Sequence, residues 1–186
     1  MNKQLSVLET ETATKLQPPL TNGALAASRK SQKGFAESFA QIVGVLMRDR
    51  HLRTMTLADL EALVLPPLIV GQFGLAHAPQ TRGNGSNGAG TAGDPVLVPV
   101  AVALWARVST NVDKALSENL DKQVRLQPAD WASGNNVWLM VLGGDPRAVP
   151  KFIEQLVEKD FKGRQVKMRL RGSDGKVMIK TFGKAP

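Results

Sequence analysis

The residue best suited to chemistry is His51, which lies in the basic run Arg48-Asp49-Arg50-His51-Leu52-Arg53. Imidazole is the only side chain that ordinarily titrates near neutrality, so it can act as a general acid or base. Neighbouring cations favour the neutral imidazole that a general base requires. The alternative interpretation is a solvated histidine in a basic connector between two helices.

Other kinds of site find little support in this sequence. It has no cysteine and only two histidines, so neither a thiolate nucleophile nor a metal site is expected. The second histidine, His77, adjoins a glycine-rich segment and is expected to be structural. Residues 83–88 superficially resemble a nucleotide-binding loop, but the lysine of such loops is missing from its place.

The length and charge of the chain suggest one basic domain with an acidic partner. A chain of 186 residues is long enough to bury a substantial core. Its formal charge is +8, and residues 145–186 carry eleven Lys or Arg against five Asp or Glu. Such a field attracts a nucleic acid, an anionic membrane surface or an acidic protein. No apolar run reaches the roughly 18–20 residues of a membrane span, and residues 1–15 lack the apolar core of a secretory signal. A cytoplasmic protein is expected.

The N-terminal third predicts an extension followed by two helices. Residues 1–34 have little periodic apolar content and are predicted to be a flexible extension preceding a domain at 35–186. Apolar residues recur at helical spacing from Phe35 to Arg48, which predicts a helix. Thr56 and Asp59 have the spacing of a capping box, and the helix that they start is predicted to stop at Pro66-Pro67.

The rest of the domain predicts an α+β fold, with a mostly antiparallel sheet and packed helices. Helices are expected from Ser109 to about Asn119 and from Asp145-Pro146 to about Asp160. Residues 79–95 are rich in Gly and Asn and are predicted to be an inserted loop. The predicted strands cover residues 68–76, 96–108, 136–142, 166–170 and 177–181.

Two tryptophan-containing segments carry a family resemblance. Residues 99–106 read PVAVALWA, and residues 130–140 read DWASGNNVWLM. The order PVAxxxWA and then DWxSGxxxW resembles the RTX toxin-activating lysine acyltransferases. The resemblance extends over about residues 45–182, interrupted by the glycine-rich insertion.

This resemblance implies a fold, an activity and partners. The fold would be similar to that of the Gcn5-related N-acetyltransferases. The activity would be transfer of a fatty acyl group from acyl carrier protein to lysines of an RTX-type protoxin. The thioester supplies the activation, so no cofactor, metal or nucleotide is expected. Similar enzymes act as homodimers, and the basic surface would receive the acidic carrier protein; no nucleic-acid partner is expected.

The resemblance also assigns the candidate site residues. His51 precedes Leu65-Pro66-Pro67 and Gln72-Phe73 at nearly the spacing of the family's essential histidine, so it is the expected catalytic residue. Trp105, Ser133 and Trp138 are the expected substrate-binding residues. From the residues alone, both tryptophans are also explained as core side chains of strands, and Ser133-Gly134 as a tight turn.

Two positions depart from the family pattern. Arg48 stands where family members often have a serine, three residues before the histidine. Val141 stands at the position of the family's second catalytic residue, an aspartate, and valine can neither orient an imidazole nor accept a proton. Asp145 is close in sequence but is expected to cap the following helix.

Three hypotheses therefore stay open. The chain is a working acyltransferase in which another carboxylate replaces the missing aspartate. It is a catalytically impaired relative that binds acyl carrier protein or protoxin without transfer. Or it is a nucleic-acid binder that uses its basic tail alone. A carboxylate within hydrogen-bonding reach of His51 would favour the first. The sequence does not specify acyl chain length or the target lysines.

Overall fold

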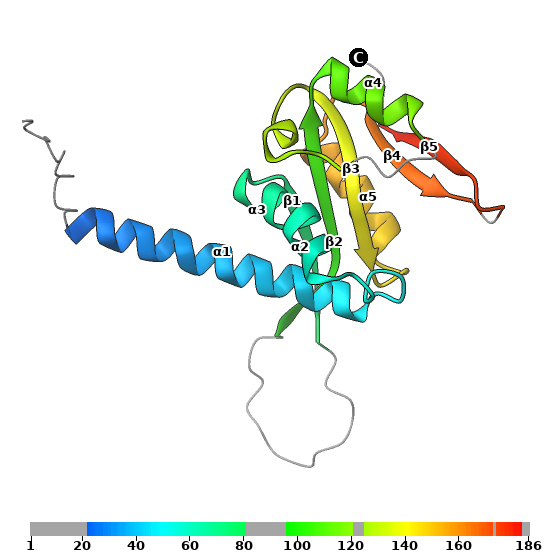
Figure 1. The fold of residues 1–186 in the computed structure, drawn as a ribbon. Coiled ribbons are helices and arrows are strands. Elements are labelled where there is room, and N and C mark those ends of the chain that lie inside the picture. The colour runs from blue at the N-terminus through cyan, green and yellow to red at the C-terminus, as the bar shows by residue number, and fades with distance from the viewer. Residues whose placement is uncertain (1–21, 81–95, 121–124, 173, 184–186) are drawn as a thin grey trace, which may run out of the picture. The chain divides into compact units, whose positions relative to one another are not determined.

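The computed structural model describes residues 22–80, 96–120, 125–172 and 174–183. The chain divides into two units, residues 1–33 and 34–186. The first unit contributes to the described structure only residues 22–33, which are helical. The second contains every strand and the remaining helices (Figure 1).

The first helix begins earlier than its apolar pattern predicts. Helix α1 spans Asn22–Arg48, so its C-terminal end is as predicted. Residues 22–33, which were predicted to belong to the flexible extension, are helical in the structure. This part of the sequence is rich in Ala, Lys and Arg, which favour helix without requiring an apolar stripe. Residues 1–21 of the predicted extension, and residues 81–95 of the predicted insertion, lie outside the described residues.

The second helix has the predicted start, but the segment that follows it differs. Helix α2 (Leu57–Leu63) begins with a capping box, in which the Thr56 hydroxyl accepts the Asp59 N–H and the Asp59 carboxylate accepts the Thr56 N–H. The two prolines then occupy the first turn of a further short helix, α3 (Leu65–Ile69). Proline is tolerated in a first turn because those N–H groups have no intrahelical partner. The predicted strand from residue 68 therefore begins later, at Phe73.

Five strands form one sheet in sequence order: β1 (Phe73–Pro79), β2 (Leu97–Val108), β3 (Asn136–Gly144), β4 (Val166–Arg171) and β5 (Val177–Phe182). All neighbouring pairs are antiparallel except β3 and β4, which are parallel. Helix α4 (Thr110–Glu118) and a 3-10 turn, η1 (Pro128–Trp131), lie between β2 and β3 in the chain, and α5 (Val149–Lys159) connects β3 to β4. The predicted α+β class with a mostly antiparallel sheet is confirmed.

Helix α5 starts four residues after the predicted Asp145 start. Its first residue is Val149 and its cap residue is Ala148, with Pro150 in the first turn. Asp145 instead begins a turn before the helix, in which its carbonyl accepts the N–H of Ala148. In contrast, Ser109 caps α4 as expected, because its hydroxyl accepts the N–H of Val112.

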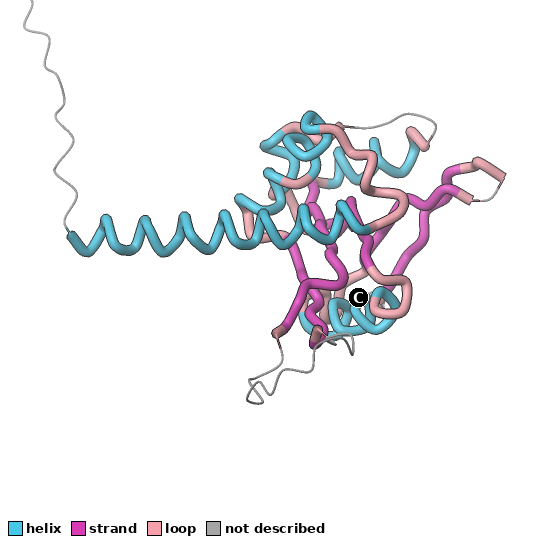
Figure 2. The backbone as a smooth tube through the Cα atoms, turned by 90° about the horizontal axis from the view of Figure 1, so that it is seen from below, coloured by secondary structure: helices cyan, strands magenta, loops and turns pink. Residues whose placement is uncertain are grey.

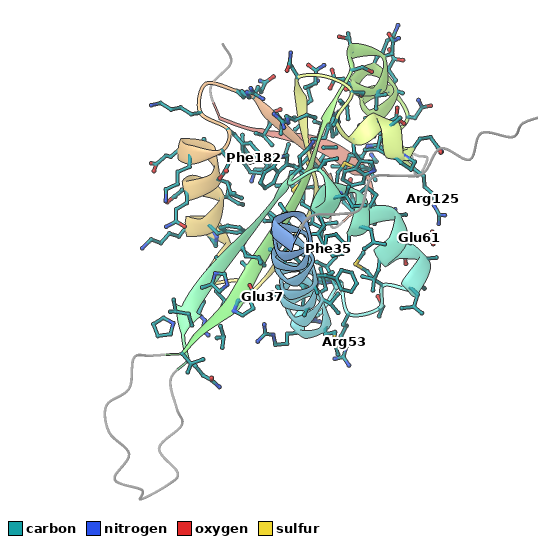
Figure 3. All side chains as sticks on the ribbon, turned by 90° about the vertical axis from the view of Figure 1, so that its left-hand side faces the viewer. Phe35, Glu37, Arg53, Glu61, Arg125 and Phe182 are labelled. Atoms are coloured by element: carbon teal, nitrogen blue, oxygen red, sulfur yellow. The ribbon has the colours of Figure 1, made fainter. Side chains whose placement is uncertain are left out.

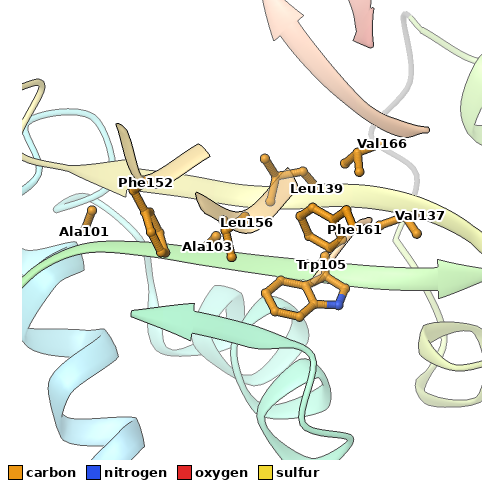
Figure 4. Packing of buried hydrophobic residues seen from close by; sticks show 9 residues of the cluster. All are labelled: Ala101, Ala103, Trp105, Val137, Leu139, Phe152, Leu156, Phe161 and Val166. Atoms are coloured by element: carbon orange, nitrogen blue, oxygen red, sulfur yellow. The ribbon is translucent and has the colours of Figure 1, made fainter. Parts of the chain in front are cut away.

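Helices cover both faces of the sheet (Figure 2). On one face, Phe152 and Leu156 of α5 pack on Trp105 and Leu139, as the close-up in Figure 4 shows. On the other face, α1, α2 and α3 pack over β2 and β3 with a separate apolar cluster. Further along that second face, Leu116 of α4 packs with tryptophans of η1 and β3.

Strand β3 has an irregularity where it leaves β4. Leu104 of β2 pairs with Val141, but the next residue, Trp105, pairs with Leu139, so Met140 is the extra residue of a β-bulge. The pairing of β3 with β4 extends only from Val137 to Leu139 on the β3 side. Beyond that point the two strands diverge, as Figure 1 shows. The bulge and the divergence together leave one side of β3 open to other groups.

Candidate active site

His51 lies in the turn that joins α1 to α2, and its side chain is exposed. The turn is organised by Asp49, whose Oδ1 accepts the backbone N–H groups of His51 at 2.8 Å and of Leu52 at 3.1 Å. Aspartate commonly stabilises a turn in this way, by bonding to backbone two residues ahead. The position of the His51 backbone thus depends on the Asp49 carboxylate.

The same carboxylate fastens this turn to the end of the sheet. Oδ2 of Asp49 accepts the N–H of Gly144, the last residue of β3, at 2.8 Å. The approach requires Gly143, because a Cβ at that position would lie 2.8 Å from Asp49 Oδ2. Burial raises the pKa of Asp49, but the three N–H donors and the nearby His51 ring outweigh it, so the pKa lies below its usual value.

A cavity of about 480 Å³ opens beside His51. Its lining includes the end of α1, the start of β2 and the end of β3. Arg48 lies at its edge and donates to the carbonyl of Gly44 at 2.8 Å and of Pro99 at 2.6 Å. The arginine that replaces the family's serine therefore ties α1 to the first residues of β2.

Asp145 provides a second carboxylate in this cavity. It forms an exposed ion pair with Arg147 at 2.9 Å, and the hydrogen bonds from Arg147 hold the pKa of Asp145 below its usual value. Within the described part of the chain, the ring of His51 makes no hydrogen bond to either carboxylate. The imidazole therefore lies near the carboxylates of Asp49 and Asp145, and among the described contacts it is hydrogen-bonded to neither.

Val141 is buried on the face of β3 that α1 covers. It is 5% exposed and packs in the apolar cluster that contains Ile42, Val64 and Leu104. Core packing thus occupies the position at which the resemblance expects an aspartate. A carboxylate does reach this end of β3 from Asp49, the residue that follows α1.

Trp138 lies beside a second cavity on the same face of the sheet. Its ring is buried, and Nε1 donates to Oδ1 of Asp113 in α4 at 2.7 Å. The cavity has a volume of about 200 Å³ and lies at the bulge where β3 leaves β4. Its lining is largely apolar, with a polar rim: Leu63, Leu116, Trp138, Met140, Arg125 and Arg169. Arg125 projects on the side of the domain that carries α2 and Glu61 (Figure 3).

Trp105 lies on the opposite face of the sheet from Trp138. Its ring meets Phe161 edge to face, with centroids 5.0 Å apart and planes at 85°, beneath α5 (Figure 4). The two tryptophans expected to bind substrate are therefore not brought together. Trp138 adjoins the cavity on the His51 side, whereas Trp105 contributes to the core of the other side.

Ser133 fixes a turn before β3. Its hydroxyl donates to the Asp130 carbonyl and accepts the N–H of Ser109, both at 2.9 Å. The amide of Gly134 donates to the carbonyl of Arg107, so this amide is already occupied. Gly134 is required because a Cβ would collide with Val108 and Ser109. Ser133 lines none of the cavities described here, and its contact with substrate stays a prediction.

Two cations of the basic C-terminal quarter hold α4 in place. Lys167 forms an ion pair with Asp113 at 2.8 Å, beside the Trp138 ring. Arg169 donates to the carbonyl of Leu116. The positive charge of β4 is therefore used partly for tertiary contacts. His77, on β1, contacts Gln41 of α1 through Nε2 at 3.0 Å.

Sequence reasoning missed two carboxylates that organise this region. Asp49 was visible only as one member of a charged run, although an aspartate two residues before a turn residue is a recognisable signal. Asp113 carried no signal, because its partners Trp138 and Lys167 are 25 and 54 residues away. Among the residues that the structure describes, no group of three His, Asp or Glu can hold a metal ion. No described helix is both long and apolar enough to span a bilayer.

The fold and the site together indicate a class of protein. An α+β sheet, with one parallel pair that diverges at a bulge, is compatible with the Gcn5-related N-acetyltransferase fold. Residues 96–182, just under half of the chain, match the model of the RTX toxin acyltransferase family. No curated protein matches the sequence.

His51 lies outside the matched segment in the sequence, but the fold places the turn that carries it next to that segment. Asp49 bonds Gly144 and Arg48 bonds Pro99, and both of these partners lie within residues 96–182. Two hydrogen bonds from the end of α1 thus attach the histidine turn to the family's sheet.

Proposed function

We propose that this protein transfers a fatty acyl group from acyl carrier protein to lysine ε-amino groups of an RTX-type protoxin. The observation that carries the proposal is the attachment of the His51 turn to the end of β3 through Asp49. This attachment places His51, the expected catalytic residue, beside β3, which is a strand of the segment that matches the family model. The cavity beside it, about 480 Å³, is within the usual range for small-molecule sites of about 300–1,000 Å³.

In this mechanism His51 acts as general base. Its neutral imidazole takes a proton from the lysine ammonium group, and the amine nitrogen then attacks the thioester carbonyl. The new C–N bond forms as the C–S bond breaks, and His51 passes the proton that it took to the departing thiolate of the carrier. The nitrogen loses a second proton to solvent as the amide forms. The thioester is already activated, so the proposal includes no metal or other cofactor.

Asp49 is the positioning residue in this proposal. The aspartate expected on β3 is replaced by buried Val141. Asp49 reaches the same strand from the end of α1 and fixes the His51 backbone at 2.8 Å.

The cavity beside Trp138 is proposed to receive part of the acyl chain. It lies on the His51 side of the sheet and is mainly apolar, with Leu63, Leu116 and Met140 around the indole. Its volume of about 200 Å³ is below the usual range of about 300–1,000 Å³ for whole ligands, so it takes a segment of a long chain. Trp105, on the other face, is not part of this proposed site.

The test is mass spectrometry of an RTX-type acceptor after incubation with acyl carrier protein loaded with C14 to C16 chains. Acyl transfer by the native chain that disappears in His51→Ala is the expected result. His77→Ala is the matched control, because His77 is also exposed but bonds Gln41 on β1's side of the fold. Equal transfer by the native chain and by His51→Ala would contradict the proposed role of His51.

A catalytically impaired relative is the second candidate function. Two observations favour it: Val141 leaves β3 without the carboxylate that the resemblance expects, and among the described residues the ring of His51 is not hydrogen-bonded to a carboxylate. In this case the native chain binds acyl carrier protein or protoxin but transfers nothing. Binding by calorimetry, combined with the transfer assay, separates the two candidates. Sedimentation of the same samples tests the homodimer that we also propose.

A further inference from the structure

A third cavity, which is positively charged, lies on the α5 face of the sheet. It has a volume of about 340 Å³ and includes Trp105 and Arg107, toward the end of β2. The His51 cavity, in contrast, includes Pro99 and Val100 at the start of β2. The two cavities therefore lie toward opposite ends of β2, and the acyl-transfer proposal does not involve the positively charged cavity.

Cations outnumber acidic groups in this cavity. Its lining includes four cationic residues, Arg107, Lys159, Lys162 and Arg164, and one acidic residue, Asp160. None of these five forms an ion pair with another part of the described structure. The C-terminal carbonyls of α5, which ends at Lys159, carry only about half a negative charge. The excess of three positive charges outweighs that effect and attracts an anion.

Gln72 contributes a buried donor without a partner. It is 1% exposed and lines this cavity. Its Oε1 accepts the N–H of Arg107 at 2.9 Å, which fixes the orientation of the amide, because only the oxygen can accept. Its Nε2 has no hydrogen-bond partner among the described residues. A buried donor of this kind is costly unless something binds it, and an anion in the cavity is a suitable acceptor.

An adjoining cavity extends this site with neutral polar groups. It has a volume of about 270 Å³ and shares Val137 and Arg164 with the positively charged cavity. Its other lining includes Asn135, Asn136 and Gln165, which can hydrogen-bond to an uncharged polar group. It also includes Lys167, whose charge is paired with Asp113. Arg164 lies at the junction of the charged and the neutral part.

We propose that the two adjoining cavities bind a phosphate ester. The phosphate group lies among Arg107, Lys159, Lys162 and Arg164, because guanidinium groups bind phosphate oxygens through paired N–H donors and lysines add point charges. The organic part of the ester lies along Asn135, Asn136 and Gln165. The neutral amide side chains beside the cations favour an ester with a polar organic part over an extended acidic protein surface. The phosphate ester can come from a free metabolite or from the prosthetic arm of a carrier protein.

The test measures binding to the full chain by calorimetry at constant ionic strength. The probes are inorganic phosphate, 4′-phosphopantetheine, unphosphorylated pantetheine and an acidic glutamate peptide, with chloride as the background anion. 4′-Phosphopantetheine is expected to bind at least tenfold more tightly than inorganic phosphate, and pantetheine is expected not to bind. Addition of apo and holo acyl carrier protein distinguishes the two sources: a preference for the holo form assigns the ligand to the carrier arm, and no preference assigns it to a free ester.

Three variants locate the binding. The double variant Lys162→Gln/Arg164→Gln is expected to weaken binding at least tenfold. Gln72→Glu keeps an acceptor for the Arg107 N–H but replaces the free donor by a carboxylate, so it also weakens binding. Lys151→Gln is the matched control, since it removes an exposed cation of α5 outside the cavity and leaves binding unchanged.

Several outcomes would overturn the proposal. They are equal affinity for pantetheine and its phosphate, equal affinity of the native chain and the double variant, and binding of the glutamate peptide alone. Because the readout is binding, loss of acyl transfer does not affect this conclusion, and absence of phosphate binding does not affect the proposed acyl transfer.

Discussion

The carboxylate of Asp49 and the backbone N–H of Gly144 form a 2.8 Å hydrogen bond between residues 95 positions apart in the sequence. The same carboxylate also accepts the N–H groups of His51 and Leu52. One side chain thus organises the histidine turn and attaches it to the end of β3. Where the resembled family has an aspartate on the strand, this chain brings a carboxylate to the strand from the end of α1.

Replacing Asp49 by Ala is expected to destabilise the fold and to abolish acyl transfer. Three N–H groups lose their acceptor, and leaving a buried or half-buried donor unpaired costs about 1–3 kcal/mol. We expect a loss of about 2 kcal/mol in the free energy of unfolding, measured by urea denaturation. Asp49→Asn keeps one acceptor oxygen and should lose less stability, yet it removes the charge beside His51 and should still reduce transfer.

The stability difference between the native chain and Asp49→Ala should depend on pH. The folded-state pKa of Asp49 is lowered, so its ionised form contributes stability in full above the unfolded pKa of about 3.9. That contribution is lost as the pH falls below about 4 and through the folded pKa. Denaturation curves between pH 3 and pH 7 should therefore converge at the acid end. A difference that stays constant to pH 3 would contradict the role assigned to the ionised carboxylate.

Val141→Asp is expected to damage the protein rather than restore the family's site. Val141 is 5% exposed among apolar side chains, and an uncompensated buried charge costs on the order of 3–5 kcal/mol. Burial raises the pKa of the introduced carboxyl group, so the penalty should shrink as the pH falls through that pKa. Val141→Asn is the neutral, equal-sized control and should lack this pH dependence. Gain of transfer in stable Val141→Asp protein would show that the strand carboxylate is what the native chain lacks.

Gly143→Ala tests the close approach between the histidine turn and β3. The added Cβ would lie 2.8 Å from Asp49 Oδ2 and would overlap the Leu52 side chain. We expect a loss of about 1–3 kcal/mol, typical of overpacking, and reduced acyl transfer. Gly44→Ala, in α1, is the matched control because nothing lies within 4 Å of its added Cβ and alanine favours helix. Thermal denaturation should show a lower Tm for the first variant and an unchanged or higher Tm for the second.

Local patterns predicted most of the fold. The capping box at Thr56 and the cap at Ser109 depend on residues only three positions apart, so the sequence reveals them directly. The predicted start of α5 and the predicted helix stop at Pro66-Pro67 were both wrong. Proline is compatible with the first turn of a helix, and the sequence does not show at which residue that turn begins. Pattern alone does not decide which turn forms; the packing of the helix on the sheet does.

The candidate site was less predictable, because its geometry depends on long-range contacts. The family resemblance indicated His51, and the structure attaches it to the matched segment through Asp49. The resemblance did not separate Trp105 from Trp138, which lie on opposite faces because one extra residue, Met140, shifts the β2–β3 register. A bulge of one residue leaves no clear signal in composition or periodicity.

Asp113→Ala is expected to disrupt the packing of α4 around Trp138. The carboxylate accepts the Trp138 Nε1–H at 2.7 Å and pairs with Lys167 at 2.8 Å. Its removal therefore leaves a buried donor and a half-buried cation without this partner. We expect a loss of about 2–3 kcal/mol in the free energy of unfolding, since each such group is costly to leave unpaired. Asp113→Asn retains an oxygen for the indole but not the charge for Lys167, and should lose about half as much. Lys114→Ala is the control, because its pair with Glu118 is exposed and such pairs contribute little. Equal stability of Asp113→Ala and Lys114→Ala would mean that this network does not hold α4 against β3 and β4.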